Sequence, residues 1–456
     1  MEERKRGARG EPLSATGGET GRALVLEPFL RRDAGAPGAR SPAARLDEAV
    51  GLARAIDLNV VQFGLVPLSE IRPATYLGKG KVEEIAGLAK SEGIGIVVMD
   101  APISPMQQRN LEKAWNAKVL DRTGLILEIF GRRARTREGA LQVEHAHLTY
   151  QKSRLVRSWT HLERQRGGFG FLGGPGETQL ETDRRLIEER LARIEADLDK
   201  VKKTRGLHRR SRQRVPYPVV ALVGYTNAGK STLFNRLTQA SVLEADMLFA
   251  TLDPTLRALD LPHGARIILS DTVGFISDLP TMLVAAFRAT LEEVIEADVI
   301  LHVRDMSHPD AEAQARDVEH VLRELGIDTH DEKRLIEVWN KIDRLSVEER
   351  KGLDNRLARL PHGKRAVAVS ALSGEGIDAL IAAIEQRIGE HRLTFVLELD
   401  PADGEGISWL HRHAEVLDKT LREDGRYAVT VRVDPTKAER LRNRFGLDAA
   451  SGASLS

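Results

Sequence analysis

Apolar positions in this chain alternate between helical spacing and short strand-like runs, from residue 43 to about residue 120. Helical spacing covers residues 43–55, 82–90 and 106–115, whereas residues 59–66 and 94–99 are short runs rich in β-branched side chains. Residues 22–28 form an earlier strand-like run. Strands separated by helices of this length predict a small parallel α/β domain.

The pattern changes after residue 120. Residues 121–166 have helical spacing and are basic, and residues 167–176 then hold six glycines in ten positions. So many glycines exclude a regular element, because too much backbone freedom would have to be frozen. Apolar residues follow at spacings of 4, 3, 4 and 3: Ile187, Leu191, Ile194, Leu198 and Val201. This seam predicts a helical hairpin arm.

A second, larger alternation of strands and helices runs from residue 216 to about residue 390, and it opens with the apolar strand 219–223. The last stretch predicts a strand at 394–399, a helix at 407–421, a strand at 427–433 and a helix at 436–444. We therefore expect five parts: a disordered tail (1–21), an N-terminal α/β domain (22–120), a helical arm with its glycine-rich loop (121–215), a larger α/β domain (216–390) and a small C-terminal α/β domain (391–456).

Composition narrows the class of protein. The 456 residues carry 68 Lys and Arg against 67 Asp and Glu, so a globally basic nucleic-acid coat is excluded. The absence of cysteine excludes disulfides, thiolate metal sites and cysteine nucleophiles. Residues 2–6 are charged, and no run of about 18 apolar residues occurs, so neither a signal peptide nor a membrane span is expected. We expect a cytoplasmic monomer, with peripheral membrane association through basic segments as a second location.

The strongest chemical motif begins where the strand 219–223 ends. Residues 224–231 read Gly-Tyr-Thr-Asn-Ala-Gly-Lys-Ser, the G-x-x-x-x-G-K-S pattern of a phosphate-binding P-loop, and a helix-like segment follows. The two glycines allow backbone N–H groups to turn inward around an anion, and the helix N-terminus adds positive potential. Lys230 is expected to reach the β- and γ-phosphates, and the Ser231 hydroxyl to bind Mg²⁺.

A second motif concerns the base of the nucleotide. Residues 340–343 read Asn-Lys-Ile-Asp after the apolar stretch 335–339. A carboxylate there accepts hydrogen bonds from N1–H and the exocyclic amine of guanine, a donor pair that adenine lacks, and an unpaired buried acceptor rejects the wrong base. The motif lies 110 residues after Lys230, and Ser370-Ala-Leu372 follows 30 residues later. This order and spacing predict a guanine-nucleotide site in a GTPase domain with a mostly parallel sheet.

The segment Asp271-Thr-Val-Gly274 lies between these two motifs. Asp271 is expected to hold Mg²⁺ through water, and the Gly274 N–H to contact the γ-phosphate, so that hydrolysis releases the flanking loop. The earlier segment Phe249-Ala-Thr-Leu-Asp253 should supply a hydroxyl to Mg²⁺, and both Thr251 and Thr255 are candidates. The predicted GTP-binding residues are Gly224, Tyr225, Thr226, Asn227, Ala228, Gly229, Lys230, Ser231, Thr232, Phe249, Ala250, Thr251, Leu252, Asp253, Asp271, Thr272, Val273, Gly274, Asn340, Lys341, Ile342, Asp343, Ser370, Ala371 and Leu372.

The four motifs look like those of a translation-factor-related GTPase. Further segments resemble the HflX family of ribosome-associated GTPases: Gly78-Lys-Gly-Lys81, residues 121–130 (DRTGLILEIF), residues 137–143 (REGALQV) and residues 173–183 (GGPGETQLETD). The resemblance covers about residues 22–445 and implies a GTPase that binds the large (50S) ribosomal subunit and its rRNA, in ribosome splitting, rescue or biogenesis. It also implies Ser231 and Thr251 as the Mg²⁺ ligands, and ATP as a further ligand of the N-terminal domain.

Phe275 stands where many related GTPases carry a water-orienting glutamine. A phenyl ring cannot orient water by hydrogen bonding, so no residue is named as catalytic. We expect slow hydrolysis by the isolated protein and acceleration by the ribosome. We also expect GTP to order the loops at 249–255 and 274–277 and to fix the N-terminal domain against the GTPase domain.

Three interpretations have alternatives. The arm carries 12 Lys and Arg against 6 Asp and Glu between residues 183 and 214, and Arg209, Arg210 and Arg212 either contact rRNA phosphates or belong to an ordinary solvated coiled coil. The segment Gly78–Lys81 either binds phosphate at the start of a helix or is a tight turn. The rival function for the whole chain is a nucleotide-regulated RNA-binding scaffold that ribosomes do not stimulate.

Overall fold

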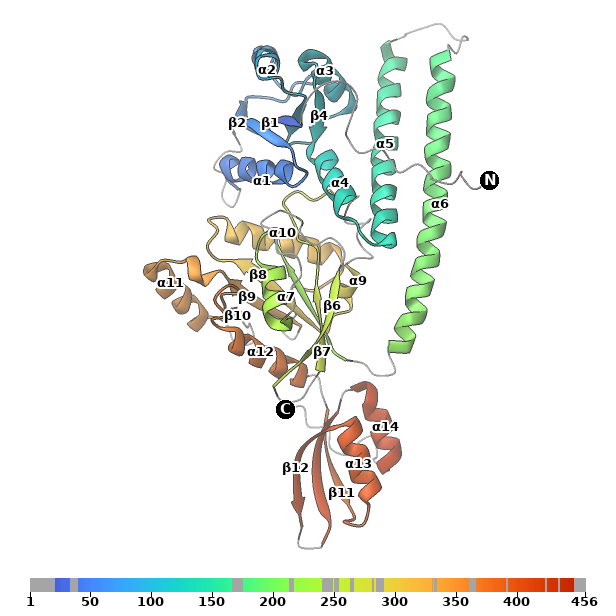
Figure 1. Ribbon diagram of the computed structural model, residues 1–456, viewed down its shortest axis with the longest axis vertical. Helices are drawn as coiled ribbons and strands as arrows, with labels where there is room; N and C mark the ends of the chain where they lie inside the picture. Colours follow the sequence, from blue (N-terminus) through green and yellow to red (C-terminus); the bar gives the residue numbers. More distant parts are fainter. Residues whose placement is uncertain are drawn as a thin grey trace, which may run out of the picture.

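The computed structural model describes residues 21–32, 40–165, 175–212, 217–239, 249, 254–262, 266–280, 283, 291–329, 331, 334–360, 366–390, 393–422, 425–433 and 435–446. Three sheets with their helices are stacked along the long axis of the molecule, and a long helical hairpin lies beside the upper two (Figure 1). This arrangement confirms the predicted fold class of a parallel α/β domain, a helical arm, a P-loop GTPase fold and a small C-terminal α/β domain.

The N-terminal part contains a four-stranded parallel sheet in the order β2-β1-β3-β4. Its elements are β1 (Arg22–Leu30), α1 (Pro42–Arg54), β2 (Asn59–Leu68), α2 (Lys79–Ser91), β3 (Ile96–Met99), α3 (Pro105–Trp115) and β4 (Lys118–Asp121). Alternate residues of β1 face opposite sides, so Leu24 packs with residues of α2 and α3, and Val25 with residues of α1. The predicted strands and helices are confirmed here, and β4 is an additional strand.

The helical arm consists of α5 (Arg137–Gln165) and α6 (Pro175–Arg212), which lie side by side after the shorter helix α4 (Arg122–Arg133) (Figure 1). Ile194, in the middle of the predicted seam, is 1% exposed. Ion pairs join the two helices, with Arg190 of α6 2.7 Å from Glu144 of α5. The predicted hairpin is confirmed, whereas residues 166–174, most of the glycine-rich loop, lie outside the described residues.

The central sheet has six strands in the order β10-β9-β8-β5-β7-β6, and only the β6–β7 pair is antiparallel. Its elements are β5 (Val219–Gly224), α7 (Lys230–Thr238), β6 (Thr255–Asp260), β7 (Arg266–Asp271), α9 (Glu292–Ile295), β8 (Val299–Asp305), α10 (Ala311–Glu324), β9 (Leu335–Asn340), the 3₁₀ turn η1 (Ile342–Arg344), α11 (Val347–Ala358), β10 (Ala366–Ala368) and α12 (Ile377–Glu390). Strands β5 and β8 are buried along most of their length, as expected where helices cover both faces. The parallel strands bring the predicted motifs to one edge of the sheet.

The C-terminal part is a three-stranded antiparallel sheet in the order β11-β13-β12, with two helices. Its elements are β11 (Leu393–Leu399), α13 (Gly404–His413), β12 (Glu415–Leu421), β13 (Tyr427–Val433) and α14 (Pro435–Phe445). The prediction of one helix over residues 407–421 is wrong in its second half, because residues 415–421 form β12. Strand β13 is central and needs a hydrogen-bonding partner on each side, and β12 satisfies its second edge.

The N-terminal and central sheets share one apolar core. Buried side chains of both parts belong to a single cluster, among them Leu125 of α4 and Val223 of β5. The rings of Phe130 and Phe249 pack edge to face across this junction, with centroids 4.8 Å apart. The N-terminal part is therefore docked firmly on the GTPase fold.

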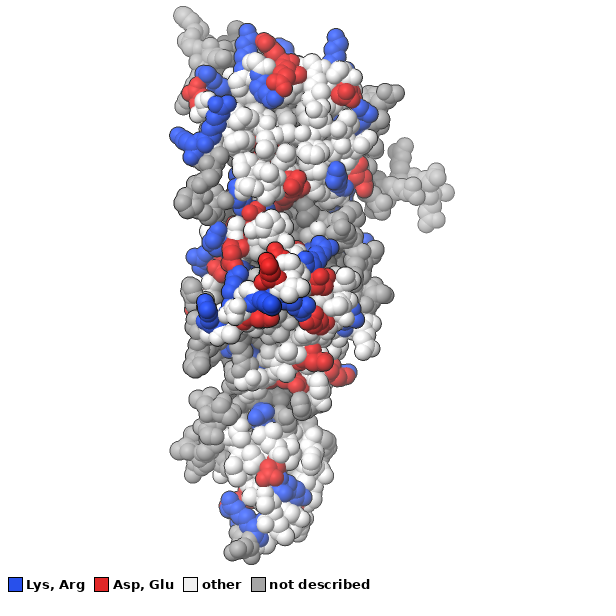
Figure 2. Space-filling model, turned by 90° about the vertical axis from the view of Figure 1, so that its left-hand side faces the viewer, with Lys and Arg blue, Asp and Glu red and all other residues white. Residues whose placement is uncertain are grey.

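The outer face of the stacked sheets mixes charges of both signs. Figure 2 shows Lys and Arg side chains intermingled with Asp and Glu on this face, without a large patch of one sign. This agrees with the net charge of +1. Within the described part of the chain, no helix combines the length and the apolar character that crossing a membrane requires.

Candidate functional site

The predicted phosphate loop lies between the end of β5 at Gly224 and the start of α7 at Lys230. Gly229 has φ +89°, in the left-handed region, and a Cβ on it would lie 2.3 Å from Asn340 Nδ2. A Cβ on Gly224 would lie 2.2 Å from the carbonyl oxygen of Val303 in β8. A side chain at either position would overlap a neighbouring element that packs against the loop backbone. Both positions therefore require glycine.

Lys230 is the cation of the phosphate loop. Its Nζ donates to the carbonyl oxygens of Gly224 at 3.1 Å and Tyr225 at 2.8 Å, and the residue is 6% exposed. Burial lowers the pKa of Lys230 to about 8, although the nearby Asp271 carboxylate opposes the shift. The loop thus holds one ammonium group within a curved backbone that opens at a helix N-terminus, the arrangement that binds phosphate oxygens.

Ser231, a predicted Mg²⁺ ligand, meets Asp271, which is predicted to hold the ion through water, beside this loop. Ser231 Oγ donates to Asp271 Oδ2 at 2.7 Å, and Asp271 is fully buried at the end of β7. A hydroxyl and a carboxylate are hard oxygen ligands, so the donor set fits Mg²⁺. Thr255 begins β6 and lies opposite Asp271 in the strand pairing, whereas Thr251 lies outside the described residues.

The predicted base-recognition motif is joined to the phosphate loop by Asn340, which is 1% exposed at the end of β9. Its Nδ2 donates to the carbonyl oxygen of Ala228 at 2.8 Å, and its Oδ1 accepts from the Ala371 N–H at 3.0 Å. One amide side chain therefore connects three predicted segments. Sequence spacing alone places them in order, and the structure brings them together.

The remaining residues of this motif form the rim of the site. Lys341 has φ +65° and its Nζ lies 2.8 Å from Asp305 Oδ2, while Asp343 sits exposed on η1. Arg236 of α7 donates to the carbonyl oxygens of Ala371, at 3.1 Å, and Leu372. These contacts fix both loops beside the exposed Asp343 carboxylate.

The segment after Asp271 packs on the phosphate loop through its backbone. The Thr226 N–H donates to the Phe275 carbonyl oxygen at 2.7 Å, and the Phe275 N–H donates to the Gly224 carbonyl oxygen at 3.1 Å. A Cβ on Gly274 would lie 2.8 Å from Thr226 Cγ2 and 3.1 Å from Lys230 Nζ. The Phe275 ring points into the core shared with the N-terminal part and is 1% exposed.

The predicted segment 249–253 and the predicted arginines of the arm are described only in part. The ring of Phe249 is buried and packs against Phe130. Nothing is described for residues 250–253, and the same holds for the side chains of Arg209, Arg210 and Arg212, which belong to α6. The structure thus assembles the phosphate loop, Asp271–Gly274, Asn340–Asp343 and Ser370–Leu372.

Sequence reasoning missed a set of charged residues next to the site. Glu48 of α1 and Arg122 of α4 are 9% and 5% exposed, and both contact Ser277, two residues after Phe275. A charged residue among the apolar positions of a helix is the sequence signal that could have indicated these two residues. Their partner Ser277 cannot be predicted from a local pattern, because it lies in another part of the chain.

The order of these segments along one edge of the sheet defines the class of P-loop GTPases. Family models agree over almost the whole chain: "GTP-binding GTPase N-terminal" matches residues 43–131, "GTP-binding GTPase Middle Region" residues 133–212, "50S ribosome-binding GTPase" residues 219–341 and "HflX C-terminal domain" residues 355–453. The chain belongs to the HflX family of GTPases and hydrolyses GTP.

Known relatives cover most of the chain. A GTPase HflX of Magnetococcus marinus is 52% identical over 400 residues, which are 88% of this chain and 89% of that protein. The GTPase HflX of Escherichia coli K12 is 47% identical over 362 residues, 79% of this chain and 83% of that protein. A solved structure described as an SsGBP–GDP complex covers 80% of this chain and 97% of its own, with a TM-score of 0.47 at 23% identity.

Proposed function

We propose that this chain is a Mg²⁺-dependent GTPase that acts on the large (50S) ribosomal subunit. The observation that carries the nucleotide part is the buried Lys230 ammonium, held between two loop carbonyls at the start of α7. In this role Lys230 binds the β- and γ-phosphates, and residues 224–232 supply backbone N–H groups to the same phosphates.

The Ser231 hydroxyl is proposed to hold Mg²⁺, with Thr251 as the second protein ligand and Asp271 acting through water. The 2.7 Å contact between Ser231 Oγ and Asp271 Oδ2 supports this, because it brings two hard oxygen atoms to one point. The ion would neutralise charge on the phosphates when bound. Ser231 and Asp271 would then hold the ion and its water in place.

Guanine is proposed to bind between Asn340–Asp343 and Ser370–Leu372, with the Asp343 carboxylate accepting from the base. The exposed position of Asp343 and the anchored neighbouring loop support this role. Hydrolysis is proposed to be slow without a partner, because the Phe275 side chain is buried in the core and offers no hydrogen bond to water.

The ribosomal part of the proposal rests on the name of the family model that matches residues 219–341, "50S ribosome-binding GTPase". We propose that the protein works in ribosome splitting, rescue or biogenesis, in the cytoplasm and as a monomer, with peripheral membrane association as a second location. The basic end of α6, with Arg209, Arg210 and Arg212, is proposed to contact rRNA phosphates.

ATP binding by the N-terminal part stays a prediction with less support. Lys79 lies 3.8 Å from Glu83 and Lys81 lies 2.6 Å from Glu84, so both lysines pair with glutamates of their own helix. Gly78 precedes α2 with φ −67°. This geometry favours a turn before a helix over a phosphate site.

The test is GTP turnover by the purified protein, alone and with 50S subunits, at low and moderate salt. We expect stimulation of at least about tenfold that fades as salt rises, because a partner supplies charge or orients water at the γ-phosphate. Lys230→Ala serves as the control, since it should remove both the basal and the stimulated rates. Turnover that 50S subunits leave unchanged would favour the rival RNA-binding scaffold.

A further inference from the structure

A cavity of about 410 Å³ lies at the ends of β1 and β3 in the N-terminal sheet, and residues of α10 close its outer side. Its inner lining includes Glu27–Leu30 from the end of β1, and Ala101 and Pro102 from the segment after β3. The volume falls in the range of pockets that bind small ligands, roughly 300–1,000 Å³. None of the residues predicted to bind GTP is among those that line the cavity.

The topology of the sheet places this cavity where parallel α/β sheets bind ligands. In the order β2-β1-β3-β4, the chain leaves β1 through α1 toward β2 on one side, and it leaves β3 through α3 toward β4 on the other. The two connections diverge between β1 and β3, so a crevice opens at the carboxyl ends of these strands. Ligands of open parallel sheets bind in such a crevice.

Two carboxyl groups lie side by side at the inner end of the cavity. Leu26 pairs with Met99 in the parallel register of β1 and β3, so the next residues, Glu27 and Asp100, are neighbours, and both are fully buried. Burial raises the pKa of Glu27 to about 9, and Asp100 adds to the rise, whereas Arg45 opposes it. Glu27 therefore keeps its proton at neutral pH and is uncharged.

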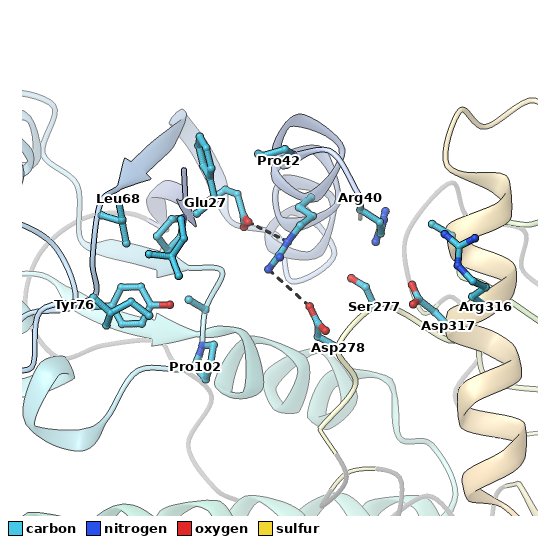
Figure 3. A pocket seen from close by; sticks show the side chains of 17 residues that line it. Glu27, Arg40, Pro42, Leu68, Tyr76, Pro102, Ser277, Asp278, Arg316 and Asp317 are labelled. Carbon is cyan, nitrogen blue, oxygen red and sulfur yellow. Dashed lines mark ion pairs between the residues drawn. The ribbon is translucent and has the colours of Figure 1, made fainter. Parts of the chain in front are cut away.

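Arg45 of α1 places a positive charge beside this uncharged group. Arg45 pairs with Glu27 on one side, Nε lying 3.0 Å from Oε1, and with Asp278 on the other, Nη2 lying 3.7 Å from Oδ2. Figure 3 shows the Glu27 and Asp278 carboxyl groups at this cavity, with dashed lines on their ion pairs. The Asp278 side chain is 68% exposed, so water screens its charge. The guanidinium therefore keeps positive charge, and it has N–H donors for a further acceptor.

Tyr76 offers a second hydrogen-bond donor to the same space. Figure 3 shows its hydroxyl directed toward the middle of the cavity. Burial raises the pKa of this hydroxyl, and Arg45 lies close enough to oppose the rise. Within the described part of the chain, the hydroxyl has no hydrogen-bond partner. A guanidinium and a phenol thus face one space, and this pair of donors suits a carboxylate.

Apolar side chains form much of the remaining lining. Phe29 and Leu30 come from the end of β1, Leu68 from the end of β2 and Ile71 from the segment that follows it. Ile71 is 45% exposed, so the apolar wall continues to the mouth of the cavity, where water now covers it. An apolar group bound there would remove this surface from water.

The charges of the lining determine the charge of the ligand. Three arginines and two aspartates line the cavity beside Glu27: Arg40, Arg45, Arg316, Asp278 and Asp317. Burial raises the pKa of Asp317 to about 6, which still leaves it ionised at pH 7.5. With Glu27 uncharged, the lining has one net positive charge. One carboxylate balances that charge, whereas the several charges of a nucleoside triphosphate would be repelled by the two aspartates.

We propose that this cavity binds a small monocarboxylic acid with an apolar aromatic or branched aliphatic body. The Arg45 guanidinium and the Tyr76 hydroxyl hold the carboxylate, and the apolar body packs against Phe29, Leu68 and Ile71 toward the mouth. Glu27 contributes by staying uncharged, because an ionised carboxyl group there would repel the ligand and neutralise Arg45. This site is separate from the proposed GTP site and does not depend on it.

The test uses 4-fluorophenylacetate as the probe, with fluorine NMR of the full-length protein at pH 7.5. We expect a saturable broadening of the fluorine signal as the protein is added. The amide 4-fluorophenylacetamide, which has nearly the same shape and no charge, should bind at least about tenfold more weakly, because it lacks the charge-assisted hydrogen bonds. Unlabelled 3-methylbutanoate should displace the probe, whereas ATP and inorganic phosphate should not.

Three variants locate the site. Arg45→Gln should weaken binding of the probe at least about tenfold, and Tyr76→Phe about 2- to 10-fold, since each removes a donor to the carboxylate. Arg54→Gln is the matched control, because Arg54 is exposed on the same helix, does not line the cavity and carries the same charge. It should change affinity by less than about twofold. Thermal unfolding midpoints verify that each variant is folded.

Ile71→Glu keeps the inference testable if Arg45→Gln does not fold. The substitution lies at the exposed mouth of the cavity and leaves both donors in place, but its negative charge should repel the probe and weaken binding several-fold. Equal affinity for the acid and its amide would overturn the inference. The same conclusion would follow if the original protein did not bind the probe, or if binding were unchanged in Arg45→Gln or Ile71→Glu.

Discussion

Asn340 Nδ2 donates to the carbonyl oxygen of Ala228 across 2.8 Å, from the end of one strand to the middle of the phosphate loop. The other end of the same amide accepts from the Ala371 N–H. Gly229 leaves the space in which this contact forms, because a Cβ there would overlap the amide nitrogen. The loop proposed to bind phosphate and the segments proposed to bind the base therefore share one buried side chain.

Asn340→Ala should weaken binding of every nucleotide. Truncation leaves the buried Ala228 carbonyl and Ala371 N–H without their hydrogen-bond partner. Each unsatisfied group costs about 1–3 kcal/mol of free energy. We expect affinity for GDP to fall at least about tenfold, measured by titration with a fluorescent analogue.

The control for this prediction is Asp343→Asn, which leaves the Asn340 contacts in place. An amide at position 343 donates as well as accepts hydrogen bonds. The variant should therefore prefer xanthine to guanine and still bind the phosphates. Unaltered GDP affinity in Asn340→Ala would contradict the role we give to the junction.

The nucleotide motifs could be predicted from sequence because their chemistry is local. A lysine and two glycines at fixed spacing, after an apolar strand, specify the phosphate loop whatever lies around it. Alternation of apolar runs likewise predicted the parallel sheets. The prediction of one helix over residues 407–421 is wrong because residues 415–421 can also form a strand. Pairing with β13 selects the strand over the helix.

The contacts of Glu48 and Arg122 with Ser277 could not be predicted in the same way. Glu48 and Ser277 are 229 residues apart, and their contact depends on how two separately formed sheets pack. The burial of Phe275 has the same origin. The sequence position of Phe275 suggested that a catalytic group is missing. In the structure its ring packs in a core that the docked N-terminal part completes. Local patterns identify the chemistry of a site more readily than its connections.

Affinity for GDP should fall as the pH rises above 8. Burial lowers the pKa of Lys230 to about 8 despite the neighbouring Asp271, so the unbound site holds an ammonium at pH 7 and mostly a neutral amine at pH 9. Phosphate binding requires the ammonium, and the complex must therefore take up a proton at the higher pH. We expect up to about a tenfold loss per pH unit above this pKa.

Calorimetry in buffers of different ionisation enthalpy measures that proton directly. Uptake should approach one proton at pH 9 and vanish at pH 7, and residual binding by Lys230→Ala should show no uptake at either pH. Equal uptake in the variant and the original protein would assign the proton to another group.

Glu27→Gln should stabilise the protein at alkaline pH. Burial raises the pKa of Glu27 to about 9, with Asp100 adding to the rise and Arg45 opposing it. The folded protein keeps a proton that the unfolded chain releases above about pH 4.3, so stability falls as the pH rises from there to about 9. The slope from this group is at most about 1.4 kcal/mol per pH unit.

Glutamine is neutral at every pH, so the variant should match the original protein near pH 5 and exceed it at pH 8. Urea midpoints at pH 5, 6.5 and 8 follow the difference. Glu92→Gln, which removes an exposed partner of Arg22, is the control and should shift stability by less than about 1 kcal/mol throughout. Parallel pH profiles for Glu27→Gln and the original protein would show that Glu27 is ionised in the fold.

Reversing Arg209, Arg210 and Arg212 to Glu should weaken binding of the 50S subunit and leave affinity for GDP unchanged. Each phosphate contact contributes about 0.7–0.9 to the slope of log affinity against log salt, so losing three should flatten that slope by about 2. Cosedimentation over a range of salt concentrations measures both quantities.

A matched variant separates this role from a general effect of charge. Arg184, Arg185 and Arg193 lie in the first half of α6 and form exposed pairs with glutamates of the same helix. Reversing these three changes the net charge by the same amount, and such pairs add little to stability. If contact with rRNA is confined to the basic end, only the first triple variant lowers the salt slope. Equal losses in both variants would mean that the arm binds through its overall charge, and no loss in either would make α6 a solvated coiled coil.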